Sequence, residues 1–197
     1  MAAALGIRFY DAQDREFVPT GGTLKEIRRI DMSRREKLLD QIELLAMCDI
    51  TNPLTGPEGA AHVFSPQKGA DEGMIQELEA GMVHYASILE QTVQIPKIRE
   101  LPGGGAAGGM GTGMAALLGA KLIPGIQAVL DTVQIDTLAE HADLILTGEG
   151  KIDSQSIHGK VLSGIARRGK ALGIPVVAIA GGIDREALPE LYRDGLT

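Results

Sequence analysis

The sequence is poor in aromatic residues and cysteine: its 197 residues include no tryptophan, three tyrosines, three phenylalanines and one cysteine. The core must therefore be aliphatic, and the aromatic platforms on which single-stranded nucleic-acid binders stack bases are missing. Cys48 cannot form an intramolecular disulfide, which fits a reducing cytoplasm. Its apolar surroundings at 44–48 predict an inert, buried thiol.

Long apolar runs and excess positive charge are also absent. No apolar stretch is long enough to span a bilayer, and the N-terminus has no basic region followed by an apolar one. Nineteen Lys and Arg against 26 Asp and Glu give a net charge of −7, which argues against a nucleic-acid backbone as ligand. We expect a cytoplasmic protein that binds neither membranes nor nucleic acid, while a small anion held by a few local donors stays open.

The length allows one large domain or two small ones. Residues 1–6 have the pattern of the last turns of a helix with its C-terminal glycine, and the chain stops at 195–197, where a further strand is expected after a helix. The sequence therefore predicts a fragment of a larger protein.

Hydrophobic patterning predicts mixed local structure in the first two thirds of the chain. The predicted elements are strands at 7–10 and 16–18 joined by a turn at 11–15, a short helix starting at Thr23–Glu26, a short helix to Leu39 followed by a strand to Cys48, and helices at 71–92 and 126–133. His84, within the long helix, is interpreted as a surface or packing residue.

The last third alternates strands and helices. The predicted elements are a buried strand at 143–147, a helix at 160–172 closed by Gly173, an apolar strand at 175–180 and a helix from 184 or 185 to 192. This order implies a right-handed crossover and a parallel sheet. Ligands of such sheets bind beyond the carboxyl ends of the strands, which places the loop 148–159 and the turn Gly181–Gly182 at a candidate site.

Glycine is concentrated in one place, with seven glycines from Gly103 to Gly113 directly before an apolar helical run at 114–118. A glycine loop that opens a helix presents unpaired N–H groups that suit an anion such as phosphate. Alternatively, the small residues let the helix pack tightly against a neighbour, and both readings stay open. The formal G-x-G-x-x-G at 103–108 follows no apolar strand, and no Walker motif occurs, so neither nucleotide-binding fingerprint is indicated.

Two other segments concentrate polar side chains. Asp49 and Asn52 follow a predicted strand, and Lys68 lies beside a glycine. Taken alone, turn formation is the favoured explanation for Asp49 and Asn52, and a solvated lysine is commoner than a phosphate contact. Segment 147–160 offers two carboxylates, two lysines, two serines and a histidine. Phosphoryl transfer needs such groups to bind magnesium and to neutralise the transferring group. Asp153 or Ser156 could instead cap the next helix, and His158 could be either a base or a hydrogen-bonded loop histidine.

Together and in this order, these segments resemble the glycerate kinase family. The resemblance runs through Asp49–Leu54, Gly59–Ala60, Phe64–Ala70, the glycine run, Thr147–Asp153 and Ser156–Lys160, and it covers nearly the whole chain. It implies a kinase that uses ATP and Mg²⁺ to phosphorylate D-glycerate, in bacterial members typically to 2-phosphoglycerate. A homodimer stays open.

The resemblance also implies an α/β fold of two domains, one inserted in the other, with the active site in the cleft between them. Residues 1–125, which carry the glycine-rich loop, would belong to a mixed α/β inserted domain. Residues 126–197 would belong to a Rossmann-like, flavodoxin-like domain with a parallel strand-helix-strand unit. Gly104 departs from the family's usual alanine, Lys151 from arginine and Leu162 from proline.

Residue chemistry suggests roles within such a kinase. The expected catalytic residues are Asp49, Lys68, Asp153 and Lys160, the expected substrate or phosphate ligands are Asn52, Gly103, Gly104, Gly105, Gly108, Gly109, Ser156 and His158, and the expected magnesium ligands are Glu149 and Asp153.

Family members extend further at both ends, which supports a second hypothesis. This chain could be a catalytically incomplete piece that binds a small anion or pairs with a partner chain carrying the missing segments. A nicotinamide-dependent oxidoreductase rests only on the formal glycine spacing and is disfavoured.

Overall fold

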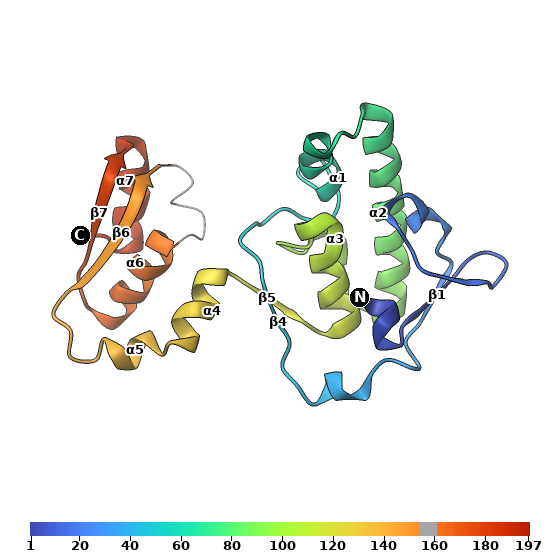
Figure 1. The fold of residues 1–197 in the computed structure, drawn as a ribbon, viewed down its shortest axis with the longest axis horizontal. Helices are drawn as coiled ribbons and strands as arrows, with labels where there is room; N and C mark the ends of the chain where they lie inside the picture. The colour runs from blue at the N-terminus through green and yellow to red at the C-terminus, as the bar shows by residue number, and fades with distance from the viewer. Residues whose placement is uncertain (154–160) are drawn as a thin grey trace. The chain divides into compact units, whose positions relative to one another are not determined.

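The computed structural model describes residues 1–153 and 161–197, and the chain divides into two compact units, Met1–Leu122 and Ile123–Thr197 (Figure 1). Each unit contains its own cluster of buried apolar side chains. The fold is mixed α/β, as the sequence predicts.

The first unit contains mainly short elements around one long helix. In chain order these are η1 (Ala2–Leu5), β1 (Arg8–Tyr10), β2 (Glu16–Phe17), η2 (Gly21–Glu26), β3 (Arg29–Asp31), η3 (Lys37–Asp40), β4 (Leu45–Met47), α1 (Ala60–Phe64), η4 (Pro66–Lys68), α2 (Glu72–Val93), η5 (Ile98–Glu100), α3 (Ala106–Gly113), the π-helical turn η6 (Met114–Leu118) and β5 (Lys121–Ile123), whose last residue starts the second unit.

The second unit alternates helices and strands. Its elements are α4 (Gly125–Thr132), α5 (Ile135–Leu138), β6 (Ile145–Ile152), α6 (Val161–Leu172), β7 (Val176–Ile183), η8 (Arg185–Ala187) and α7 (Leu188–Asp194).

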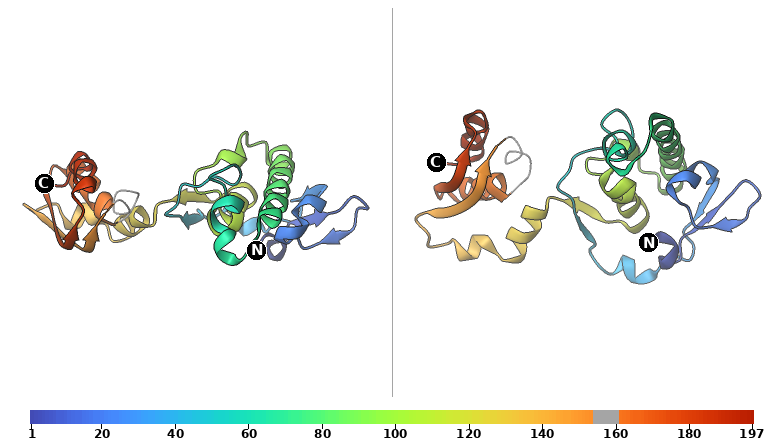
Figure 2. Two further views of the ribbon diagram at one scale, coloured as in Figure 1. Left: turned by 90° about the horizontal axis from the view of Figure 1, so that it is seen from above. Right: turned by 45° about the horizontal axis from the view of Figure 1, so that its top comes forward.

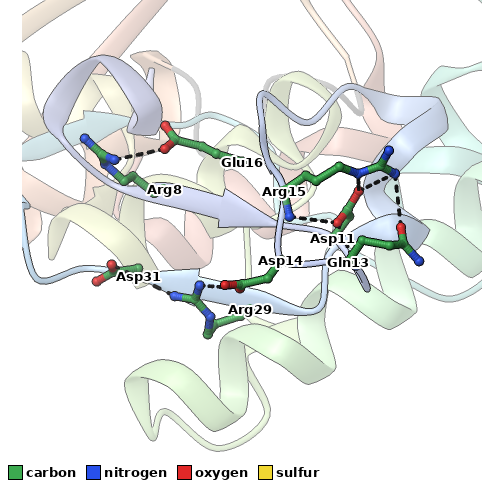
Figure 3. Close-up of polar contacts among 8 residues, drawn as sticks. All are labelled: Arg8, Asp11, Gln13, Asp14, Arg15, Glu16, Arg29 and Asp31. Atoms are coloured by element: carbon green, nitrogen blue, oxygen red, sulfur yellow. Dashed lines mark hydrogen bonds and ion pairs between the residues drawn. The ribbon is translucent and has the colours of Figure 1, made fainter.

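A small antiparallel sheet with strand order β2-β1-β3 lies at the start of the first unit. Phe9 of β1 pairs with Phe17 and Ile30 on its two sides and is buried in the core. The turn between β1 and β2 is held by Asp11, which accepts hydrogen bonds from the backbone N–H and the guanidinium of Arg15 (Figure 3). The backbone N–H of Arg15 is the main reason why the pKa of Asp11 is lowered. The two predicted strands and their polar turn are confirmed.

Helix α2 is the main element of the first unit and lies alongside α1 and α3 (Figures 1 and 2). Asp71 caps its start, because the carboxylate accepts a hydrogen bond from the N–H of Met74 at 2.8 Å. Its core-facing side buries Met82, Tyr85 and Leu89, so the predicted amphipathic helix is confirmed. His84 is a packing residue as expected, since its Nε2 lies 2.6 Å from the carbonyl oxygen of Ile27.

Several predicted boundaries in the first unit are wrong. The Thr23–Glu26 segment does not start a helix: η2 begins at Gly21, and Thr20 is its cap. The predicted helix to Leu39 is a single 3-10 turn, and the strand after it is reduced to β4. β4 pairs with β5, which explains why so short a strand forms.

Strands β6 and β7 are parallel neighbours connected through α6, as the strand-helix-strand pattern predicts. Both strands are longer than predicted. Gly148–Ile152 continues β6 and Gly181–Gly182 continues β7, so neither segment is the loop or turn expected from its glycines. Continuous parallel pairing overrides the weak strand propensity of glycine here, with Gly148 opposite Ile179.

The β6–β7 pair is buried on one face only, so the prediction of a buried strand at 143–147 is wrong. Ile145 and Ala178 pack against the buried cluster that includes residues of α6, and Figure 2 shows α6 beside the two strands. Side chains alternate between the faces of a strand. Leu146 and Ile179 accordingly point away from that cluster and are 64% and 66% exposed.

Helices α6 and α7 are joined by a polar contact around Asp194. Ser163 Oγ donates to this carboxylate at 2.6 Å and Arg167 Nε at 2.9 Å. Burial alone would raise the pKa of Asp194, but these two donors outweigh it and lower the pKa. Within the described residues, no helix is both long and apolar enough to cross a membrane.

The buried face of α2 gives the first testable prediction. Leu89 is 0% exposed, whereas Met74 on the same helix is 53% exposed. We expect Leu89→Ala to lower the free energy of unfolding by about 3 kcal/mol, because it leaves a cavity in the core. The control Met74→Ala should change it by less than about 0.5 kcal/mol. Urea unfolding followed by circular dichroism measures both, and equal effects would contradict the packing described.

Candidate active site

A cavity of about 320 Å³ in the first unit brings together three segments that are far apart in the sequence. Its lining includes Asp49 from the segment after β4, Lys68 from η4, and Gly108 from the glycine run. The expected site residues Asp49, Lys68 and Gly108 therefore do meet in one place. A carboxylate, an ammonium group and backbone donors around one cavity can bind a small hydroxy acid and accept a proton from it.

Lys68 is positioned by a short 3-10 turn. Pro66 occupies the first position of η4, where the missing N–H has no consequence, and Gly69 ends it in the left-handed region at φ +91°. The side chain of Lys68 is exposed. This turn thus presents a solvated cation at the rim of the cavity.

The loop 48–54 and the glycine run are packed backbone against backbone. The N–H of Gly105 donates to the carbonyl oxygen of Asn52, and the N–H of Leu54 donates to that of Arg99, each at 3.0 Å. A Cβ atom on Gly105 would lie 2.3 Å from the carbonyl oxygen of Pro53. No residue other than glycine fits at this contact.

Two more glycines of the run meet the same loop. A Cβ atom on Gly103 would lie 2.8 Å from Cys48 Sγ, and one on Gly109 would lie 2.7 Å from Leu54 Cδ1. For these positions the close-packing alternative is the one that the structure supports.

The glycine run also packs against itself. The carbonyl oxygen of Gly104 accepts hydrogen bonds from the backbone N–H and the buried Oγ1 of Thr112, at 3.0 and 3.2 Å. A Cβ atom on Gly104 would lie 2.5 Å from that Oγ1, and one on Gly111 would lie 2.3 Å from the carbonyl oxygen of Gly103. The structure thus gives a reason for glycine at position 104.

Gly108 differs from its neighbours because a Cβ atom there would meet nothing within 4 Å. Ala107, Gly108 and Gly109 adopt left-handed conformations in succession, with φ +51°, +71° and +93°. Within the described residues, the N–H groups of Ala107 and Gly108 donate no hydrogen bond. Successive N–H groups at a right-to-left-handed change form a concavity that suits an anion, so the anion-binding alternative stays open for this part of the run.

Asn52 is engaged in the loop and is not among the residues that line the cavity. Its Nδ2 donates to the carbonyl oxygen of Glu58 at 2.8 Å, which closes the turn 52–58. Glu79 of α2 holds the same turn, because its Oε1 accepts the N–H of Gly56 at 2.7 Å, and its Oε2 lies 3.5 Å from His62 Nδ1. Sequence reasoning missed Glu79, since no motif connects a helix residue to a turn 23 positions earlier.

Cys48 is half-buried and lines the cavity, so it is less enclosed than the sequence predicts. Its Sγ donates to the carbonyl oxygen of Ile50 at 3.3 Å and lies 3.6 Å from that of Gly103. The thiol thereby joins the loop 48–54 to the glycine run.

The remaining expected residues belong to the second unit. Glu149 lies in β6 opposite Ala180, and Asp153 directly follows the strand. Ser156, His158 and Lys160 lie outside the described residues.

Glu149 lies within β6, whereas Asp153 follows the last strand residue, Ile152, in a bend. The shared magnesium site predicted for these two carboxylates stays a prediction. Within residues 1–153 and 161–197, no three His, Cys, Asp or Glu side chains gather as a metal site.

Comparison with known proteins places these features in a family. The model of the glycerate kinase family matches residues 1–197. A glycerate kinase of Halalkalibacterium halodurans is 44% identical over 183 residues, and the glycerate 2-kinase of Escherichia coli K12 is 42% identical over 183 residues. Each alignment covers 93% of this chain and 48% of the relative, so the chain spans about half the length of these curated relatives.

A solved crystal structure agrees with the sequence comparison. The protein, provisionally assigned as glycerate kinase 2 of Salmonella typhimurium LT2, is 38% identical to this chain with a TM-score of 0.80. The match covers 98% of this chain and 56% of that structure.

The packing of the glycine run gives the second prediction. Gly105→Ala should lower the free energy of unfolding by about 2–3 kcal/mol, because the new methyl group collides with the carbonyl oxygen of Pro53. Gly108→Ala should cost about 1 kcal/mol, from left-handed strain alone. Gly22→Ala, with nothing near its Cβ, is the control and should stay within about 0.5 kcal/mol. Chemical denaturation measures all three, and a tolerated Gly105→Ala would disprove the close approach of the two loops.

Proposed function

Because the chain belongs to the glycerate kinase family, we propose that the protein transfers the γ-phosphoryl group of ATP to a hydroxyl group of D-glycerate. The expected product is 2-phosphoglycerate, and the expected compartment is the cytoplasm. The observation that supports this assignment most directly is the cavity shared by Asp49, Lys68 and the unpaired N–H groups of Ala107 and Gly108.

Glycerate carries one carboxylate and two hydroxyl groups, and the cavity offers a partner for each kind of group. We assign the carboxylate to Lys68 and the N–H groups of Ala107 and Gly108, since a cation and oriented backbone donors both favour an anion. Asp49 then accepts the proton of the reacting glycerate hydroxyl, while the oxygen of that hydroxyl forms a bond to the γ-phosphorus. The bond from that phosphorus to the β,γ-bridging oxygen breaks, and ADP leaves with the electron pair.

Asn52, Gly103, Gly104, Gly105 and Gly109 have a different role in this proposal. Their contacts within the loops hold Asp49, Lys68 and the N–H groups of Ala107 and Gly108 in position. We therefore propose that they shape the site and do not contact the substrate directly.

Residues of the second unit are proposed for the nucleotide. Lys160 would counter charge on the transferring phosphoryl group, with Ser156 and His158 as further hydrogen-bonding groups. Mg²⁺ neutralises charge on the phosphates in such reactions and takes one or two carboxylates beside phosphate oxygens. We assign this role to the carboxylates of Asp153 and Glu149.

The kinase assignment predicts glycerate-dependent release of ADP from MgATP. Asp49→Asn and Lys68→Ala should each lower turnover by about 100-fold or more, because one removes the proton acceptor and the other a charge that orients the substrate. Lys37→Ala, at an exposed lysine that does not line the cavity, is the control and should leave turnover unchanged.

A binding measurement keeps this test decisive if the chain alone turns over slowly. Titration with D-glycerate should shift the amide NMR signals of Ala107 and Gly108 in the unsubstituted chain and in the control, but not in Lys68→Ala. Normal turnover in both active-site variants, or no shift at these amides, would contradict the assignment.

The exposed face of β6–β7 supports the second candidate, a chain that pairs with further polypeptide. Parallel strands are normally covered on both faces, yet Leu146 and Ile179 are largely exposed here. We propose that this face is covered by association, in the simplest case with a second copy of the chain.

The pairing proposal predicts a concentration-dependent mass. Light scattering coupled to size exclusion should show self-association of the chain, which Ile179→Lys should abolish by placing a charge on the apolar face. Glu140→Lys, an exchange of charge at an exposed position before β6, serves as the control. A strictly monomeric chain, or an unaffected Ile179→Lys variant, would contradict the pairing.

A further inference from the structure

The first unit contains a second cavity, of about 240 Å³, that the kinase assignment does not use. Apolar side chains and glycines supply nearly all of its lining, including Phe9, Ile27 and Met82. No charged side chain lines it. It shares the left-handed residues Ala107 and Gly108 with the candidate active-site cavity.

Tyr85 of α2 brings a polar group to this apolar lining. The residue is 9% exposed, and within the described part of the chain its hydroxyl makes no hydrogen bond. Burial raises the pKa of this hydroxyl above its usual value, so the group is a neutral donor at physiological pH. The Tyr85 oxygen is not among the fully buried side-chain atoms that lack a partner. The hydroxyl therefore keeps access to solvent through the cavity, where it can donate a hydrogen bond to a ligand.

Glycines create the space in front of this hydroxyl. Gly109 and Gly113 both line the cavity, and a Cβ atom on Gly113 would lie 3.6 Å from the Tyr85 oxygen. Gly113 has ordinary helical angles, φ −62° and ψ −41°. Its backbone conformation therefore does not require glycine, and the missing side chain leaves room beside the hydroxyl.

We propose that this cavity binds a small uncharged molecule with an apolar body and one oxygen that accepts a hydrogen bond from Tyr85. The size is adequate, since an apolar cavity of about 150 Å³ admits benzene. The lining is apolar and contains no charged side chain to compensate for the desolvation of an ion, which favours an uncharged ligand. The proposal does not depend on the kinase assignment.

Two matched probes test the proposal: 4-methylphenol, which has an apolar ring and a hydroxyl, and toluene, which lacks the oxygen. Titration of the chain followed by amide NMR should give saturable shifts at Tyr85, Gly109 and Gly113 with both probes. Tyr85→Phe should lower the affinity for 4-methylphenol by about five- to tenfold, as expected for the loss of one hydrogen bond. The affinity for toluene should stay unchanged.

Two further variants serve as controls. Gly113→Ala should fold, since its methyl group would meet the Tyr85 oxygen at an ordinary contact distance, and it should weaken both probes by reducing the space. Tyr192→Phe, at an exposed tyrosine of α7, should leave both affinities unchanged. The proposal is overturned if neither probe shifts these amides at millimolar concentration, or if Tyr85→Phe affects both probes equally.

Discussion

The structure of the first unit depends on the direct packing of two backbones, the loop 48–54 and the glycine run. The hydrogen bond from Gly105 to Asn52 is possible only because no side chain separates the two chains. The same contact reaches α2, since the carbonyl oxygen of Arg99 binds Leu54 while its guanidinium binds Glu90 of that helix. The long helix thereby fixes the loop that carries Asp49.

The second unit contains a two-stranded parallel sheet, β6–β7, that the chain itself covers on one face only. β6 and β7 are paired in parallel from Ile145 to Ile152, and α6 packs on one face. A Cβ atom on Gly181 would lie 2.8 Å from the carbonyl oxygen of Gly150, so glycine allows the strands to approach closely near their carboxyl ends. The other face leaves Leu146 and Ile179 largely exposed to solvent, which is unfavourable for apolar side chains.

Sequence reasoning predicted the elements whose signal is local. Helix α2 has both a capping aspartate and a repeated apolar face, and the order of β6, α6 and β7 required a parallel pair. The extension of β6 through Gly148 was missed, because pairing with β7 is a tertiary contact that outweighs local propensity. Similarly, no local pattern could reveal that the helix cap-like sequence at Thr23 lies inside η2.

The sequence indicated which residues belong to the candidate site, but not which of them line the cavity and which only hold the loops together. Residue types pointed to Asp49, Lys68 and the glycines, whereas only the positions of neighbouring atoms separate Gly105, which must admit a backbone, from Gly108, which faces open space. Asn52 has the chemistry of a ligand, yet its amide closes a turn.

The left-handed turn at Ala107–Gly108 lines both the candidate active-site cavity and the apolar cavity. A ligand in either cavity would lie against the same turn. If one ligand changes the affinity for the other through this turn, thermodynamic linkage requires the reverse change to be equal. The turn is therefore the place where occupancy of the apolar cavity could act on substrate binding, without any contact between the two ligands.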